Sequence, residues 1–278
     1  MQKIKYPLII SDFDGTLLKS DGTIAQETKD VIDGYMGAGG RFALCTGRTP
    51  SSILPRVKEL GLKGLVACYQ GSVVMDIETG DLKQDGFLPT DGAVEICQAM
   101  EEMGLHVHVY ELYQYYSNMD DDALKLYEKI SGVKGVVCNE KPLSAFVKDS
   151  GMKVCKVLAL VAPEEKEKVY QALQKRFGNE FYVTYSAAFL VEITSRRYSK
   201  ASAVECIADY YGVPVQETIA IGDSLNDLPM LERAGLGIAV KNADENVKER
   251  AKLAYGYTND ENAVGKIVKE FGFWSEEE

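Results

Sequence analysis

Two carboxylates, Asp12 and Asp14, follow an apolar run and stand two positions apart. In an extended chain, side chains i and i+2 share one face, so both carboxylates can point at one target. Two like charges this close are costly unless a cation or a shared proton relieves their repulsion. A hard cation with oxygen ligands, such as Mg²⁺, meets that need. The alternative is an ordinary turn, because Asp and Gly15 are turn residues and Thr16 could be a cap.

The residues before Asp12 predict the strand that positions this pair of carboxylates. Residues 6–10 are apolar on both faces, which is typical of a buried parallel strand. Asp12 then falls at the carboxyl end of the strand, which is the edge where open α/β sheets bind their ligands.

Two more expected strands also end in polar residues. Residues 41–45 form a short apolar strand that ends in Thr46 and Gly47 and leads into a helix. Free N–H groups at the start of that helix favour a phosphate, although a plain strand-to-helix loop explains the same residues. Residues 218–221 form the other strand, and the polar residues after it include Asp223, Asn226 and Asp227.

The order of elements indicates an α/β protein with an insertion. Residues 1–86 follow a βαβαβ order, and Thr23 and Gln26 match a capping box at the first helix. Right-handed crossovers then predict a doubly wound, mostly parallel sheet. Residues 87–193 alternate less regularly, which indicates an inserted α+β domain. Residues 194–278 return to α/β order and are expected to complete the core with residues 1–86.

Composition limits the class of protein. The chain has 278 residues and a formal net charge of −11, whereas a protein that binds nucleic-acid backbones needs a basic face. No apolar run approaches the roughly 20 residues that span a bilayer, so no membrane partner is expected. Six scattered cysteines without a C-x-x-C pair predict reduced core residues and a cytoplasmic location. No oligomeric state follows from the sequence.

The two histidines of the chain, His106 and His108, lie in one apolar segment. Side chains two positions apart on a strand share a face, so the pair could hold a metal ion. We favour a structural role for both over a metal site.

The order of these motifs resembles the haloacid dehalogenase-like superfamily of phosphotransferases, over nearly the whole chain. The first motif is Asp12-Phe-Asp-Gly-Thr16 and the last is Gly222-Asp-Ser-Leu-Asn-Asp227, and together they are highly specific. Thr46-Gly-Arg48 and Lys200 are weak indications of this family when taken alone. They become more specific because they occur in the same order as the motifs of the family. The chain is most similar to the Cof-type sugar-phosphatase branch, in which a large α/β cap domain follows the second motif.

The resemblance implies a Mg²⁺-dependent phosphatase for a small phosphorylated metabolite, with a sugar phosphate as the first candidate. It implies that Asp12 attacks phosphorus to form an aspartyl-phosphate, and that Asp14 acts as general acid and base. The other implied roles are metal binding by Asp12, Asp14 and Asp223, phosphate binding by Thr46, Gly47, Lys200 and Asn226, and support by Asp227. Taken alone, Lys200 could be a solvated helix residue and Asp227 a helix cap.

One segment departs from the family pattern. Related proteins usually carry Asn-Gly-Ala before the cap, and this chain has Tyr69-Gln70-Gly71-Ser72 there. The departure concerns a contact with the substrate or with residues that support the site, and it leaves the nucleophile unaffected.

Two other functions are compatible with these motifs. A phosphomutase of the phosphomannomutase type would move phosphate between two hydroxyls of one sugar without releasing it. A non-catalytic phosphometabolite-binding protein would keep the fold and lose turnover. The intact set of Asp12, Asp14, Lys200 and Asp223 argues against the binding protein.

Overall fold

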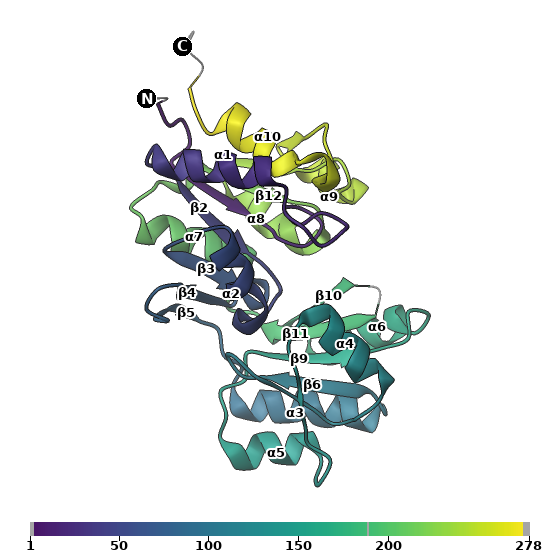
Figure 1. The fold of residues 1–278 in the computed structure, drawn as a ribbon. Helices are drawn as coiled ribbons and strands as arrows, with labels where there is room; N and C mark the ends of the chain where they lie inside the picture. Colours follow the sequence, from purple (N-terminus) through teal and green to yellow (C-terminus); the bar gives the residue numbers. More distant parts are fainter. Residues whose placement is uncertain (1–2, 188, 275–278) are drawn as a thin grey trace. The chain divides into compact units, whose positions relative to one another are not determined.

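A computed structural model describes residues 3–187 and 189–274 of the chain (Figure 1). The chain divides into two units, each with its own sheet. The first contains the residues up to Thr46, then Arg56–Gln84 and the residues from Ser199 onward, and the second contains Gly47–Pro55 and Asp85–Tyr198. The predicted insertion, residues 87–193, therefore falls within the second unit, which also takes up the segment after Thr46.

The first unit is built on an eight-stranded sheet. Its strands are β1 (Leu8–Ser11), β2 (Arg41–Cys45), β3 (Leu65–Cys68), β4 (Val73–Asp76), β5 (Leu82–Asp85), β12 (Thr218–Gly222), β13 (Leu236–Ala239) and β14 (Leu253–Ala254). Their order in the sheet is β14-β13-β12-β1-β2-β3-β4-β5. Pairing is parallel from β14 through β3, and β4 runs antiparallel to β3. The predicted α/β fold with a mostly parallel sheet is confirmed.

The position of β1 between β2 and β12 determines where the polar residues that follow these strands come together. All four residues of β1 are buried, as its apolar sequence predicts. Its last residue, Ser11, is level with Leu44 of β2 and Ile221 of β12. The backbone N–H of Asp12 donates to the carbonyl of Ile221 at 2.8 Å and extends the pairing by one residue. The loops after these three strands therefore begin at one edge of the sheet.

The helices of the first unit complete its layers. They are α1 (Gln26–Gly37), α7 (Lys200–Tyr210), α8 (Leu228–Arg233), α9 (Glu245–Arg250) and α10 (Ala263–Phe271), while α2 (Pro50–Glu59) has residues in both units. Short 3₁₀ turns are η1 (Tyr69–Gly71), η2 (Val215–Glu217), η3 (Leu225–Asp227) and η4 (Asn259–Glu261). As Figure 1 shows, α1 packs against α10, and α7 against α8.

The predicted capping box at Thr23 is wrong. The first helix, α1, begins after Ala25, and no side chain caps it. The hydroxyl of Thr23 instead donates to Oδ1 of Asp21 at 2.6 Å, and the backbone N–H of Thr23 donates to the same oxygen. This local turn holds Thr23 before the helix, because short polar side chains compete with helical hydrogen bonds.

The second unit is an α+β unit with a six-stranded sheet. Its strands are β6 (His106–Tyr110), β7 (Tyr115–Ser117), β8 (Val136–Val137), β9 (Lys156–Leu160), β10 (Phe181–Ala187) and β11 (Leu190–Ser195), in the order β10-β11-β9-β6-β7-β8. Its helices are α3 (Thr90–Glu102), α4 (Asp122–Ser131), α5 (Leu143–Ser150) and α6 (Lys166–Phe177). Within the described part of the chain, no helix has both the length and the apolar character that a membrane span requires.

The two faces of the second sheet differ in chemistry. Val107 and Val109 of β6 join the apolar core formed with α3, α5 and α6. His106 and His108 alternate with these valines and therefore lie on the opposite face. Their Nε2 atoms are 3.1 Å apart, and Nδ1 of His106 lies 3.1 Å from Oδ2 of Asp121. The rings thus bond to each other and to protein groups, which fits the structural role that we favoured.

Acid should destabilise the protein through these histidines. Burial lowers the pKa of both, and the charge of Asp121 only partly opposes this for His106. The unfolded chain therefore binds protons more readily below about pH 6.5, so the free energy of unfolding should fall as the pH drops from 7 to 5. The fall can reach about 1.4 kcal/mol per pH unit for each extra proton that the unfolded chain binds.

Replacing His106 and His108 with glutamine removes every imidazole of the chain. Urea titrations of this variant at pH 7, 6 and 5 should show a smaller loss of stability in acid than wild type. Equal losses in the two proteins would mean that other groups cause the acid sensitivity.

Candidate active site

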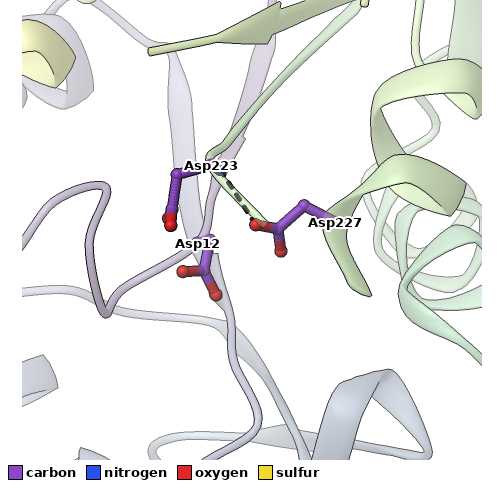
Figure 2. A group of neighbouring side chains, drawn as sticks. All are labelled: Asp12, Asp223 and Asp227. Atoms are coloured by element: carbon purple, nitrogen blue, oxygen red, sulfur yellow. Dashed lines mark hydrogen bonds between the residues drawn. The ribbon is translucent and has the colours of Figure 1, made fainter. Parts of the chain in front are cut away.

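Three aspartates meet at the carboxyl edge of the first sheet. Asp12 follows β1, Asp223 follows the neighbouring strand β12, and Asp227 ends the 3₁₀ turn η3. One carboxylate oxygen from each lies within 4.8 Å of those of the other two. Figure 2 shows the carboxyl groups of Asp12 and Asp223 near each other, with Asp227 bonded to the backbone of Asp223. The parallel register of β1 and β12 thus brings together residues from distant parts of the sequence.

Lys200, the first residue of α7, supplies positive charge to this cluster. Ser199 caps the helix, and the capping box with Ser202 defines where the helix begins. The Nζ of Lys200 donates to Oδ1 of Asp12 at 2.6 Å and to Oδ1 of Asp227 at 2.5 Å. Its side chain is 1% exposed, so Lys200 is not a solvated helix residue.

Asp227 also organises the loop after β12. Its Oδ2 accepts hydrogen bonds from the backbone N–H groups of Asp223 and Ser224, both at 2.9 Å. The carboxylate of Asp223 accepts from the hydroxyls of Thr16 at 2.5 Å and Ser224 at 2.8 Å. A Cβ on Gly222 would lie 2.5 Å from the Cβ of Asp227, so this close approach requires glycine.

The carboxyl groups of the cluster outnumber the ammonium group that is bonded to them. Burial raises the pKa of Asp12 well above its usual range, Asp227 adds to the rise, and Lys200 opposes it. Burial and the charge of Asp227 raise the pKa of Asp223 to about 6. Burial would lower the pKa of Lys200, but the attraction of Asp12 and Asp227 outweighs it and raises that pKa, so Lys200 stays charged. One ammonium therefore faces three carboxyl groups.

The donor set fits a hard divalent cation. Carboxylate oxygens are the ligands that Mg²⁺ prefers, and a cation would offset the burial and the repulsion that raise the pKa of Asp12 and Asp223. Asp227 already accepts from Lys200 and from two backbone N–H groups. These bonds suit Asp227 to holding the other groups in place rather than to ligating the ion itself.

The remaining predicted site residues lie as follows. Asp14 is exposed, two residues after Asp12. Thr46 is buried after β2, and its carbonyl accepts from the N–H of Gln70 at 3.0 Å. The Nδ2 of Asn226 donates to Oε1 of Gln70 at 2.9 Å. These residues belong with Lys200 to the first unit, whereas Gly47 is part of the second.

Sequence reasoning missed two residues of this region. The sequence suggests only a cap for Thr16, but its hydroxyl donates to the carboxylate of Asp223, and its place in the Asp12–Thr16 motif is the available signal. In the sequence, Gln70 is only a departure from a family pattern, whereas in the structure it contacts both Thr46 and Asn226. Its hydrogen bonds depend on an unusual turn that residue types do not predict.

Gly15→Ala should disturb this site specifically. Gly15 has a φ of +80°, and a Cβ there would lie 2.7 Å from Oδ2 of Asp223. We expect a loss of about 1–2 kcal/mol from the left-handed backbone, together with a large loss of catalytic activity as Asp223 is displaced. Gly22→Ala is the matched control, because Gly22 has a φ of +79° and nothing within 4 Å of its added Cβ.

Thermal unfolding and kcat, measured for wild type and both variants, test this expectation. Both variants should lose similar stability, and only Gly15→Ala should lose activity. An active Gly15→Ala enzyme would show that the position of Asp223 matters little for turnover.

Comparison with known proteins agrees with this geometry. Residues 9–268 match the model of the haloacid dehalogenase-like hydrolase family. YxeH of Bacillus subtilis (strain 168) is 29% identical over 269 residues, which are 95% of this chain and 98% of YxeH. YwtE of the same strain, named a 5-amino-6-(5-phospho-D-ribitylamino)uracil phosphatase, is 28% identical over 282 residues, which are 94% of this chain and 96% of YwtE.

A solved structure shows the same fold. The crystal structure of a haloacid dehalogenase-like hydrolase from Bacteroides thetaiotaomicron has a TM-score of 0.83 and 26% sequence identity, and the match covers 95% of this chain and 99% of that one. The chain therefore belongs to the haloacid dehalogenase-like hydrolase family, and the resemblance predicted from the motifs, including its Cof-type branch, is confirmed. This family and the phosphatase names among the relatives support a phosphoric monoester hydrolase.

Proposed function

We propose that this protein is a Mg²⁺-dependent phosphatase that hydrolyses a small phosphorylated metabolite through an aspartyl-phosphate on Asp12. The observation that carries the proposal is the buried carboxyl group of Asp12, which is bonded to Lys200 and lies beside Asp223 at the ligand-binding edge of the sheet. Burying a carboxylate is costly unless it is paired, and Lys200 supplies the charged partner of Asp12.

The reaction needs a nucleophile, a proton donor and charge compensation. An oxygen of Asp12 bonds to phosphorus while the bond to the leaving-group oxygen breaks, and Asp14 gives that oxygen its proton. Water then attacks the phosphorus, loses its proton to Asp14, and inorganic phosphate leaves Asp12. The exposed position of Asp14 suits a group that exchanges protons with water and substrate.

Other residues would hold the anionic groups in place. Asp12 and Asp223 would ligate Mg²⁺ with their carboxylates and Asp14 with its carbonyl. When bound, the ion would supply positive charge to the phosphoryl oxygens. Lys200 would neutralise Asp12 and the phosphoryl group together, and Thr46 and Asn226 would donate hydrogen bonds to its oxygens.

The proposed substrate class is a phosphate ester of a polyhydroxylated metabolite, with a sugar phosphate as the first candidate. YwtE, which matches 94% of this chain, is named for a substrate that carries a phosphorylated ribityl group. A ribityl group is an open-chain sugar alcohol, so its chemistry is close to that of a sugar phosphate.

A phosphate-release screen tests this proposal. The substrates are sugar phosphates, nucleotides, flavin mononucleotide, pyridoxal phosphate and the ribitylaminouracil phosphate, each with Mg²⁺ or with EDTA. Release that requires Mg²⁺ and is fastest with polyol or sugar phosphates is the expected result. Transfer within a hexose phosphate without release would indicate a mutase, and tight phosphate binding without turnover would indicate a binding protein.

A further inference from the structure

The turn after β3 has an unusual backbone. Tyr69, Gln70 and Gly71 have φ values of 52°, 60° and 81°, so three consecutive residues are left-handed. Only Gly71 adopts such a φ without steric cost, since Tyr69 and Gln70 carry a Cβ. Strained residues of this kind persist where the surrounding structure holds them, and they occur often at functional sites.

Several contacts hold this turn against the predicted active site. The N–H of Gln70 donates to the carbonyl of Thr46 at 3.0 Å. A Cβ on Gly71 would lie 2.5 Å from the carbonyl oxygen of Ser199 and 2.8 Å from Cα of Lys200, so the turn and the start of α7 touch through their backbones. The turn is therefore locked between the loop that carries Thr46 and the residue that carries the buried ammonium.

The side chain of Gln70 is only half satisfied. It is 2% exposed, and its Oε1 accepts from Nδ2 of Asn226 at 2.9 Å. This bond pairs the acceptor end of the Gln70 amide with the donor end of the Asn226 amide. The other end, Nε2, is buried and makes no hydrogen bond with any described part of the protein. A buried amide donor without an acceptor is costly and rare, so an acceptor from outside the chain is expected there.

We propose that Gln70 is a substrate-binding residue whose Nε2 donates a hydrogen bond to an oxygen of the phosphoryl group. The proposal rests on the phosphatase function proposed above. A phosphoryl oxygen is a strong acceptor, and Thr46, Asn226 and Lys200, the neighbours of the Gln70 turn, are the residues predicted to bind phosphate. Gln70 has a second effect in this arrangement, because its Oε1 holds the Asn226 amide in one orientation.

The test compares Gln70→Met with a matched variant, Gln84→Met. Methionine keeps the length of the side chain and removes the donor. Gln84 is also a buried glutamine, but its Nε2 is satisfied by the carbonyl of Gly71 at 2.5 Å and the hydroxyl of Ser202 at 3.2 Å. Gln84→Met therefore perturbs the same turn while leaving the proposed donor in place. Gln70→Glu adds a negative charge where the phosphoryl group would sit.

The readouts are KM and kcat with para-nitrophenyl phosphate, the inhibition constant of inorganic phosphate, and calorimetric binding of inorganic phosphate to each Mg²⁺-loaded protein. We expect Gln70→Met to weaken phosphate binding and raise KM by a similar factor of about 10, since the lost bond is to a charged acceptor. Gln70→Glu should weaken both further. Gln84→Met should lower the melting temperature and change phosphate affinity by less than about twofold.

Unchanged phosphate affinity in Gln70→Met would overturn the proposal, and a water molecule would then be the partner of Nε2. A rise in KM that depends on the leaving group, with unchanged inhibition by inorganic phosphate, would also overturn it. If wild type binds phosphate but does not hydrolyse esters, the proposed function fails while calorimetry still decides the role of Gln70. If wild type does neither, both proposals fail.

Discussion

Asp12→Asn should abolish hydrolysis, with kcat reduced by at least about 10⁴-fold and the fold retained. Asparagine keeps the size of the side chain but its amide cannot form the aspartyl-phosphate, so the first step is lost rather than slowed. Steady-state assays with the best substrate of the release screen measure the effect, and circular dichroism checks the fold.

Asp30→Asn is the matched control for this change. Asp30 is an exposed residue of α1 that bonds to Gln26, outside the cluster at the sheet edge. Its variant should keep the activity of wild type. If Asp12→Asn retained more than about a hundredth of the wild-type kcat, another group would have to be the nucleophile.

Lys200→Met should cost both stability and activity. Removing the ammonium leaves the carboxyl groups of Asp12 and Asp227 buried without their positive partner. Breaking a buried ion pair in this way lowers the free energy of unfolding by about 3–5 kcal/mol. Activity should fall by a factor on the order of 10²–10³, because the phosphoryl charge also loses its partner. Urea unfolding of the metal-free protein and kcat with Mg²⁺ measure the two effects.

Two further variants identify the cause of that loss. Asp227→Asn combined with Lys200→Met removes one of the two stranded carboxylates, so the double variant should be more stable than additivity predicts. Lys125→Met breaks the ion pair between Lys125 and Asp122, whose side chains are 68% and 100% exposed, respectively. This variant should change the free energy of unfolding by less than about 1 kcal/mol. Similar losses for Lys125→Met and Lys200→Met would contradict the importance of the buried charges.

The core of the fold could be predicted because its central strands are mostly apolar. The run before Asp12 reads as a buried strand, and parallel pairing of β1 with β12 then brings Asp12 and Asp223 to one edge. Lys200 could be placed there only from the order of the family motifs, since its own helix has no local sign that its first residue is buried. The catalytic roles of these residues remain predictions.

Some short elements of both units could not be predicted. Helix α5 has eight residues, too few to be stable alone, and it forms because Leu143 and Val147 pack into the core shared with α3 and α6. Strand β14 has only two residues, and it exists through its pairing with β13. Such elements depend on contacts distant in sequence, which local patterns do not contain.

The role of Gln70 lies beyond sequence reasoning for a different reason. Its position depends on two left-handed residues that each carry a Cβ, a conformation that residue types argue against. Only the bonded turn, held by Thr46 and by the backbone of Lys200, explains why this conformation persists.

The most direct test of the central claim is to trap the covalent intermediate. Wild type would be mixed with its best substrate and Mg²⁺, quenched in acid within milliseconds, digested, and examined by mass spectrometry for a phosphorylated aspartate. We predict a phosphoryl group on the peptide that contains Asp12, specifically on that residue, and none in the Asp12→Asn variant. Rapid hydrolysis by wild type with the phosphoryl group on a different residue would contradict the account. So would rapid hydrolysis with no phosphoryl group on the protein, under conditions where the intermediate forms as fast as it is hydrolysed.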